Sequence, residues 1–290
     1  MADRTPPTPG ARNLVLITFD SCRHDTFVAA APRAIARLGA VERRFSYASW
    51  TAPSHYNLLM GLMPHPSPTH VFASEHYKRD FLRFSERLGI EGVAFEQMLP
   101  ALYLPPFLRD THGYHTRALV SLPVMNEHTP LAVGFDSYEL MPTHNDMEAM
   151  LGRLRFDPDR PTFTLLNVGE THYPYALPDE PSEEWPRIAG VNGVFRSLGE
   201  GPAEGHLHHR DSEPRFFDDA RLERLRRRQI RAVAHLDGVV ERLFDVVPPG
   251  TWIVITSDHG ELFGEDGYFG HGPIMHPKVF EVPFVEGLRP

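Results

Sequence analysis

Two short runs of apolar, β-branched residues each end close to an acidic residue, and this pairing constrains the fold more than any other feature. Residues 13–19 (NLVLITF) precede Asp20, and residues 251–256 (TWIVIT) precede Ser257 and Asp258. Runs of this length and composition are typical of buried strands. Ligands of open α/β sheets lie beyond the carboxyl ends of parallel strands. If both strands belong to one sheet, the two carboxylates therefore emerge at the same edge.

The rest of the sequence alternates strand-like with helix-like patterns. Further strands are expected over residues 116–122 and 162–168. Helices are expected over residues 32–38, 54–62 and 217–247, the last with an apolar stripe at helical spacing. This alternation predicts an α/β fold with a mostly parallel central sheet.

The length of 290 residues fits one large α/β domain. Residues 1–12 are polar and rich in proline, and we expect them to form a flexible tail before a single domain over residues 13–290. Residues 178–214 are rich in Pro, Gly and charge, which predicts a long loop or lid insertion. A local histidine cluster within it (His206, His208 and His209) is interpreted as part of a solvated loop.

Charge and composition exclude several classes of protein. The net charge of −9 argues against nucleic-acid binding, which needs a basic surface. It is compatible with a small anionic substrate, because a bound metal reverses the local field. The N-terminus lacks the apolar core of a secretory signal, and no stretch approaches the ~18 consecutive apolar residues of a membrane span. We therefore expect a cytoplasmic protein without membrane partners; the oligomeric state is not predicted.

The groups that follow the first and last strands form a candidate metal site. Asp20, Asp258 and His259 together offer two carboxylates and an imidazole, which suit Zn²⁺ or Mn²⁺. The simpler alternative is that each Asp caps a helix after its strand and that His259 is a loop residue.

Three segments resemble motifs of the alkaline phosphatase/sulfatase superfamily, in the same order along the chain. They are the opening strand (LVLITFDSCRHD, residues 14–25), a nucleophile segment (SYASWTAPSHYNLLMGLMPH, 46–65) and a late metal motif (VITSDHGELFGEDGYFGHG, 254–272). A weaker echo, NVGETHYPY over residues 167–175, resembles a segment of sulfatases and phosphoethanolamine transferases. The resemblance implies an alkaline-phosphatase-like three-layer sandwich.

The resemblance also implies the roles of individual residues. Thr51 would be the nucleophile and a metal ligand, and Asp20, Asp258 and His259 would be the other ligands. The implied cofactor is one or two divalent ions, with Zn as the first candidate and Mn, Ca or Mg as alternatives.

Two further histidines, His172 and His271, would act on the substrate or its leaving group; the alternative is that they are hydrogen-bonded loop residues. His55 would join them in binding an anionic substrate, and Arg23 would either help to bind an anionic group or merely sit in a loop. His55 stands where sulfatases carry an arginine.

Two departures from the sulfatase pattern bear on the reaction. Thr51 cannot be converted to formylglycine, and Ser21 replaces the second Asp of the first motif. Both weigh against sulfate esters, and a Thr nucleophile resembles the phosphodiesterase and phosphoethanolamine transferase branch. We therefore predict a metal-dependent hydrolase or phosphotransferase that forms a phospho-threonine. The alternatives are a sulfatase-like or phosphonate-ester hydrolase, and a catalytically silent scaffold in a biosynthetic pathway.

Overall fold

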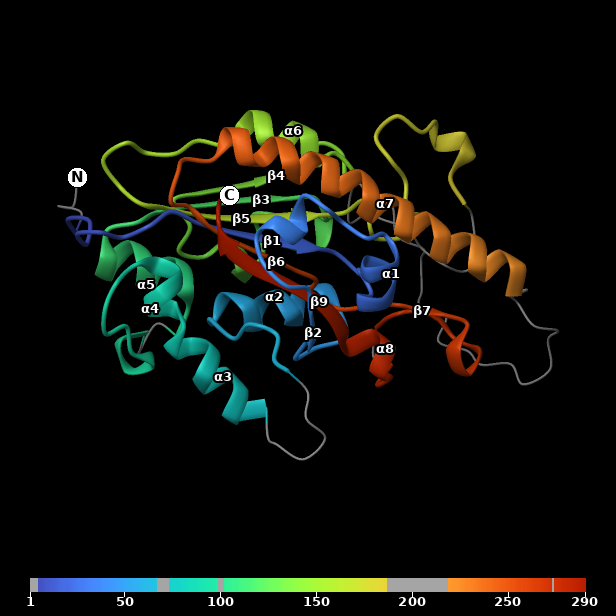
Figure 1. The fold of residues 1–290 in the computed structure, drawn as a ribbon, viewed down its shortest axis with the longest axis horizontal. Coiled ribbons are helices and arrows are strands. Elements are labelled where there is room, and N and C mark those ends of the chain that lie inside the picture. The colour runs from blue at the N-terminus through green and yellow to red at the C-terminus, as the bar shows by residue number, and fades with distance from the viewer. Residues whose placement is uncertain (1–4, 67–72, 99–101, 187–218, 273) are drawn as a thin grey trace.

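A seven-stranded sheet forms the centre of the computed structural model (Figure 1), which describes residues 5–66, 73–98, 102–186, 219–272 and 274–290. Its strands are β1 (Leu14–Phe19), β2 (Glu42–Phe45), β3 (His115–Val120), β4 (Ser137–Leu140), β5 (Thr162–Val168), β6 (Trp252–Thr256) and β9 (Glu281–Leu288). The strand order is β2-β9-β6-β1-β5-β3-β4. Only β9 pairs antiparallel with its neighbours, β6 and β2, so the predicted mostly parallel α/β sheet is confirmed.

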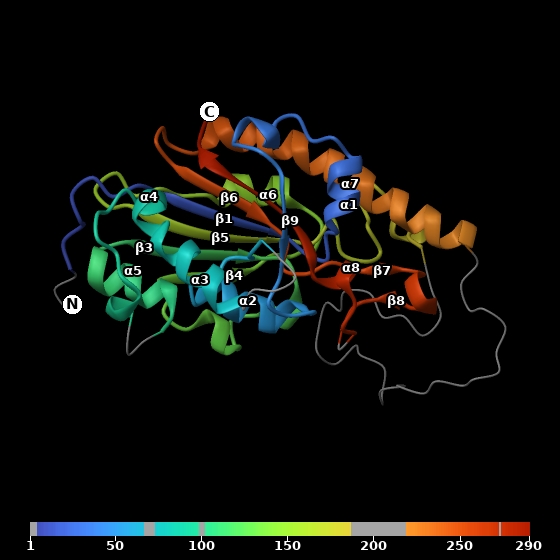
Figure 2. The ribbon, with the colours of Figure 1, turned by 60° about the horizontal axis from the view of Figure 1, so that its bottom comes forward.

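Helices cover both faces of this sheet, as Figures 1 and 2 show. One layer consists of α1 (His24–Ala29), α6 (Met147–Arg153) and α7 (Asp219–Val246). The opposite layer consists of α2 (Thr51–Leu59), α3 (Ala73–Leu82), α4 (Phe84–Leu88) and α5 (Leu104–His112). A small hairpin of β7 (Leu262–Phe263) and β8 (Phe269–Gly270) lies with α8 (Pro277–Phe280) beyond one end of the sheet. The result is the expected three-layer sandwich.

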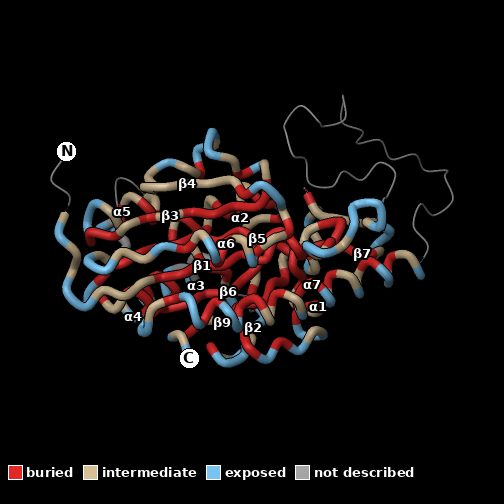
Figure 3. Tube along the Cα trace, turned by 90° about the horizontal axis from the view of Figure 1, so that it is seen from above, coloured by how far each residue is buried: buried red, intermediate tan, exposed pale blue. Residues whose placement is uncertain are grey.

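The alternation of side chains along β1 builds both cores. Val15, Ile17 and Phe19 pack into the cluster beneath α1, α6 and α7, whereas Leu14 and Leu16 pack into the cluster beneath α2 to α5. All five are fully buried, and Figure 3 shows the central strands as the buried interior of the molecule. A strand covered on both faces needs apolar residues at every position, which explains the continuous apolar run in the sequence.

Strand register brings the two acidic residues together. β1 and β6 pair in parallel with Thr18 opposite Thr256, so Asp20 and Asp258 occupy equivalent positions two residues further on. Both leave the sheet at its carboxyl edge, which confirms the expectation from the sequence.

Residues 5–12 do not form the expected loose tail. The backbone N–H of Thr8 donates to the carbonyl of His112 at 3.1 Å, and that of Arg12 donates to the carbonyl of Leu88 at 2.7 Å. These bonds attach the segment to the ends of α5 and α4. Of the expected lid over residues 178–214, only residues 178–186 are described, and the histidine cluster lies outside the described residues.

The helix expected over residues 32–38 is reduced to one 3₁₀ turn, Ile35–Arg37. The carboxylate of Asp237 accepts hydrogen bonds from the backbone N–H groups of Arg33, Ala34 and Ile35. The side chain of Asp237 on α7 therefore satisfies backbone N–H groups at the start of this turn, which have no partner within a helix. Among the described helices, none combines the length and the apolar character needed to span a bilayer.

Candidate metal centre and active site

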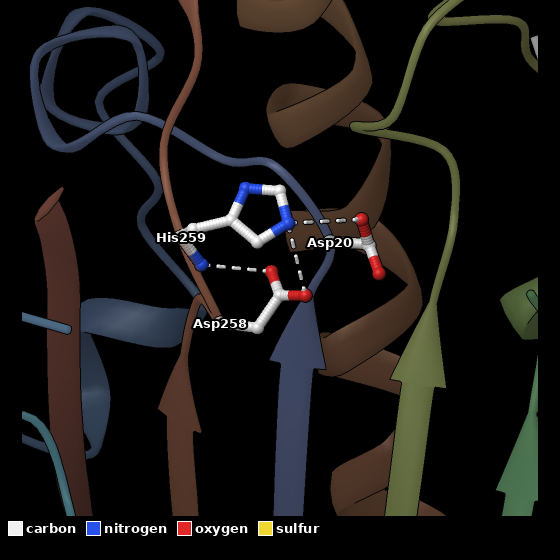
Figure 4. Close-up of side chains that lie close together, drawn as sticks. All are labelled: Asp20, Asp258 and His259. Carbon is white, nitrogen blue, oxygen red and sulfur yellow. Dashed lines mark hydrogen bonds and ion pairs between the residues drawn. The ribbon is translucent and has the colours of Figure 1, made fainter. Parts of the chain in front are cut away.

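Three buried side chains converge beyond the carboxyl ends of β1 and β6. Asp20 follows β1, Asp258 and His259 follow β6, and Figure 4 shows all three pointing toward one another. Their ligand atoms lie within 4.8 Å of one another, and each residue is at most 1% exposed. This arrangement matches the candidate metal site of the sequence.

The donor atoms of this cluster fit a divalent cation. Nδ1 of His259 lies 2.9 Å from the carbonyl oxygen of Gly260, which can only accept, so Nδ1 carries the proton. The lone pair of Nε2 then faces Asp258 Oδ2 at 3.4 Å and Asp20 Oδ1 at 4.0 Å. Asp258 Oδ2 is buried without any hydrogen-bond partner. A cation bound between these atoms would satisfy all three.

The electrostatics of the cluster favour the same conclusion. Burial lowers the pKa of His259, which keeps the imidazole neutral, as metal ligation requires. Burial and the neighbouring Asp20 raise the pKa of Asp258 well above its usual range. Burial alone would also raise the pKa of Asp20, but His172, His259 and other neighbours lower it. A cation would allow both carboxylates to ionise in this interior.

Neighbouring groups hold the two carboxylates in place. Asn167 on β5 donates to Asp20 Oδ2 at 3.1 Å, and the Ser21 hydroxyl donates to Asp20 Oδ1 at 3.1 Å. The backbone N–H groups of Ser21 and His259 donate to Asp258 Oδ1 at 3.1 and 2.9 Å. Ser21 has a left-handed φ of 60°, a conformation that costs energy for a residue with a Cβ. In the sequence, Ser21 stands out only as a departure from the sulfatase motif, and no motif points to Asn167.

Thr51 lies beside this cluster as the first residue of α2. It is 6% exposed, and its Oγ1 lies 3.4 Å from Nε2 of His259. The preceding Trp50 is extended and its side chain does not cap the helix. The helix N-terminus therefore presents uncapped N–H groups and a partial positive charge beside the cluster.

The two predicted loop histidines meet beside His259. His172 follows β5 and His271 follows β8, and their ring centroids are 5.5 Å apart. The centroids of His271 and His259 are 4.3 Å apart. Nδ1 of His172 lies 2.8 Å from the carbonyl oxygen of Tyr173, which leaves Nε2 as its acceptor in the neutral form. The structure thus brings both histidines to the candidate centre.

Glu261 is a buried partner of His271 that the sequence analysis missed. Its Oε1 lies 3.4 Å from Nδ1 of His271, and its Oε2 accepts a hydrogen bond from the hydroxyl of Tyr175. Burial opposes the charged form of His271, but Glu261 outweighs it and raises the pKa of that imidazole. The Ser-Asp-His-Gly-Glu motif contained the signal, since Glu261 is its last residue.

The structure argues against His55 as a substrate-binding residue. Its side chain is fully buried between α2 and β1, with Nε2 2.9 Å from the Thr18 hydroxyl and Nδ1 2.8 Å from the carbonyl oxygen of Thr51. Both ring nitrogens are therefore occupied by the protein. His55 instead joins the first turn of α2, next to Thr51, to strand β1.

Arg23 is also placed differently from the expectation. Its guanidinium is 3% exposed and forms two hydrogen bonds with the Asp25 carboxylate, at 2.8 and 2.6 Å. It also donates to Glu265 at 2.6 Å and to the carbonyl of Glu261 at 3.2 Å. These partners connect the end of β1 to the loop that carries Glu261, so Arg23 is a structural clamp and not an anion-binding residue.

Gln229, a polar residue in the apolar stripe of α7, fastens two loops of the site. Its Nε2 donates to the carbonyls of Ser21 at 2.9 Å and Thr171 at 3.0 Å, and its Oε1 accepts from Thr26 at 2.6 Å. Helical periodicity identified the stripe but gave no signal for this residue.

The comparisons with known proteins support the family and the fold. A model of the family described as Sulfatase matches residues 12–285. No curated protein matches the sequence. Two structures of the C-terminal periplasmic domain of EcEptC from Escherichia coli are similar to the whole chain and are covered over 76% of their own length. Their identities are 14% and 16% and their TM-scores 0.55 and 0.56; the first is a complex with Zn. The structure of BT1596, a 2-O GAG sulfatase, has 13% identity and a TM-score of 0.55 over 96% of this chain and 64% of its own.

Proposed function

This chain belongs to the sulfatase family, and we propose that it is a metal-dependent phosphoric-ester hydrolase or phosphotransferase with Thr51 as its nucleophile. One observation carries the proposal. The Thr51 hydroxyl lies at the N-terminus of α2, 3.4 Å from His259 and beside the buried cluster of candidate ligands. A hydroxyl beside a cation is placed to attack an anionic ester.

Asp20, Asp258 and His259 would hold the cation, and Thr51 Oγ1 would be the fourth donor. This mixed set of carboxylate, imidazole and hydroxyl suits Zn²⁺, and Mn²⁺, Mg²⁺ and Ca²⁺ are the alternatives. Among the described residues, Asp20, Asp258 and His259 form the one group of at least three His, Cys, Asp or Glu side chains that could hold a metal ion, and the number of ions stays at one or two.

The reaction would proceed through Thr51 and the loop histidines. A bound divalent cation would lower the pKa of the Thr51 hydroxyl, so that its proton leaves to solvent, and would offset charge on the phosphoryl group. Oγ1 attacks phosphorus, an Oγ–P bond forms, and the bond from phosphorus to the leaving oxygen breaks. His271 gives that oxygen a proton. Water or a second alcohol then attacks the phospho-threonine, returns a proton to His271 and releases Thr51.

Sulfate and phosphonate esters are the second candidate class, favoured by the family match. Thr51 weighs against sulfate, since a threonine cannot supply formylglycine. A catalytically silent scaffold is the third candidate. It gives no reason for Asp258 Oδ2 to be buried without a partner beside a second carboxylate.

Metal analysis combined with a substrate panel tests the proposal. The purified chain is assayed with aryl phosphate, phosphodiester, phosphonate and aryl sulfate esters, before and after chelation. We expect stoichiometric metal and chelator-sensitive turnover of a phosphorus ester. Turnover of the sulfate alone would favour the second class, and no turnover of any ester would favour the scaffold.

We propose a small anionic ester as the substrate, without a nucleic-acid or membrane partner. The cytoplasmic location stays a prediction, which cell fractionation tests. The periplasmic location in the names of the similar E. coli structures is a property of those proteins.

A further inference from the structure

A pocket of about 230 Å³ opens beside the ends of β3 and β4, two strands away from the metal centre. Its wall includes Ser121, Met141, Pro142, His144, Glu180 and Trp185. We propose that this pocket is a subsite for an uncharged, hydroxylated ring of the substrate, such as a sugar unit. That the substrate is an ester reacting at the metal centre rests on the proposed function. The binding of a ring in this pocket does not depend on it.

The described wall of the pocket includes apolar side chains, and its charged side chain is paired. Met141, Pro142 and Trp185 supply apolar surface, and the rings of His144 and Trp185 pack edge to face with centroids 5.4 Å apart. The one charged side chain of the described wall is Glu180, and its carboxylate is bonded to Arg228 and Arg231 of α7. A charged ligand would therefore find no unpaired counter-charge here, whereas the apolar face of a sugar ring suits an aromatic side chain.

Ser121 provides an unpaired hydroxyl at the wall of the pocket. It is 2% exposed, it lines the pocket, and its hydroxyl oxygen has no hydrogen-bond partner in the protein. Buried hydroxyls are normally paired, so an unpaired one at a pocket wall points to a partner on a ligand. A ring hydroxyl would supply both a donor and an acceptor.

Asn167 connects this pocket to the metal centre. Its Oδ1 accepts from the backbone N–H groups of Ser121 and Leu122 at 3.2 and 3.3 Å, while its Nδ2 donates to Asp20 at 3.1 Å. With neighbouring strands about 4.8 Å apart, β1 and β3 are separated by roughly 10 Å. This spacing is comparable to the length of an ester group joined to one ring. The pocket volume, below the range of about 300–1,000 Å³ for sites of drug-sized ligands, also fits a single ring.

Binding of neutral rings to the full chain tests the inference without reference to catalysis. The probes are methyl glucoside, methyl galactoside and myo-inositol, and ligand-observed NMR titration gives the dissociation constants. We expect at least one probe to bind. Ser121→Ala should weaken it about five- to tenfold, the worth of one hydrogen bond. Because that hydroxyl has no partner in the protein, the melting temperature should not fall. Trp185→Ala should weaken binding more than tenfold.

Thr164→Val is the matched control. Its hydroxyl is also buried and unpaired, but it lies within β5 and outside the described wall of the pocket. It should leave the dissociation constant unchanged. The subsite proposal is wrong if none of the three rings binds. It is also wrong if Ser121→Ala and Trp185→Ala both bind the ring as the wild type does.

Thr51→Ala separates this inference from the proposed function. Ring binding should persist in that variant, because it lacks only the nucleophile. If Thr51→Ala keeps full activity while Ser121→Ala loses the ring, the nucleophile is wrong and the subsite stands. If Thr51→Ala is inactive and no ring binds, the reverse holds.

Discussion

Oγ1 of Thr51 lies 3.4 Å from Nε2 of His259, although 208 residues separate them along the chain. The segment before α2 is bonded to the segment after β6, because the Ser46 hydroxyl donates to the carbonyl of Asp258. The backbone N–H of Ser46 also donates to the carbonyl of Phe280 at 2.9 Å. The hydrogen bonds of Ser46 therefore help to set the position of the candidate nucleophile relative to the candidate ligands.

Replacing Thr51 tests the nucleophile directly. Thr51→Ala should lower kcat by roughly a thousandfold or more on the best phosphorus ester, because no other group replaces the attacking oxygen. Thr51→Ser should keep part of the activity, because the hydroxyl survives. Mass spectrometry of acid-quenched wild-type enzyme should detect phosphate on the peptide that contains Trp50 to Pro53. Wild-type turnover by Thr51→Ala would refute the assignment.

Asp258→Asn should lower the metal content, because the substitution keeps the shape of a ligand but removes its charge. We expect at least a tenfold loss of metal affinity, measured by elemental analysis during dialysis against a chelator. Chelation should also lower the melting temperature of the wild type, since it leaves two buried carboxylates uncompensated, and should change that of Asp258→Asn far less. Asp25→Asn, an acidic residue bonded to Arg23, is the control. Equal metal content in all three proteins would contradict the site.

Glu261→Gln should move the alkaline limb of the rate profile. Glu261 raises the pKa of His271, so the protonated acid persists to higher pH in the wild type and is lost as pH rises through that pKa. Without the carboxylate, kcat/KM should begin to fall at lower pH. Glu265→Gln removes a charge from the same loop but one that faces Arg23, and it should leave the limb in place. If kcat/KM falls at the same alkaline pH in Glu261→Gln and in the wild type, His271 is not the group that protonates the leaving oxygen.

The buried carboxyl group of Glu170 should make the free energy of unfolding depend on pH. Burial raises its pKa from 4.5 to about 7, while Oε1 accepts from the backbone N–H of Met147 at 2.7 Å. Between these two values the folded chain keeps a proton that the unfolded chain has lost, so the free energy of unfolding falls as pH rises. The total fall is roughly 3 kcal/mol, at about 1.36 kcal/mol for each pH unit.

Urea denaturation of the wild type and Glu170→Gln between about pH 5 and pH 8 measures this effect. The variant should lack this part of the pH dependence, because a glutamine does not ionise, while its oxygen can still accept from Met147. Parallel pH dependence in the two proteins would show that Glu170 does not hold the proton.

The sequence by itself determined the central strands and the residues of the candidate ligand cluster. β1, β5 and β6 are covered on both faces, so burial requires apolar side chains along their whole length, and this pattern is legible without a structure. The parallel arrangement places Asp20 and Asp258 at the same edge of the sheet, and they meet because β1 and β6 are neighbouring strands. The helix α7 was legible for the same reason, because its buried face repeats at helical spacing.

Only the tertiary structure decided what the polar residues around that cluster do. Arg23 and His55 both carry groups that suit an anionic substrate, yet each is occupied by the protein: Arg23 by Glu265, 242 residues away, and His55 by Thr18 on the neighbouring strand. Conversely, Asn167 looks like an ordinary strand residue until β5 places it beside Asp20. Burial of apolar side chains depends on local periodicity, which a sequence displays. A hydrogen-bond partner depends on which distant segment the fold brings within about 3 Å, which a sequence does not display.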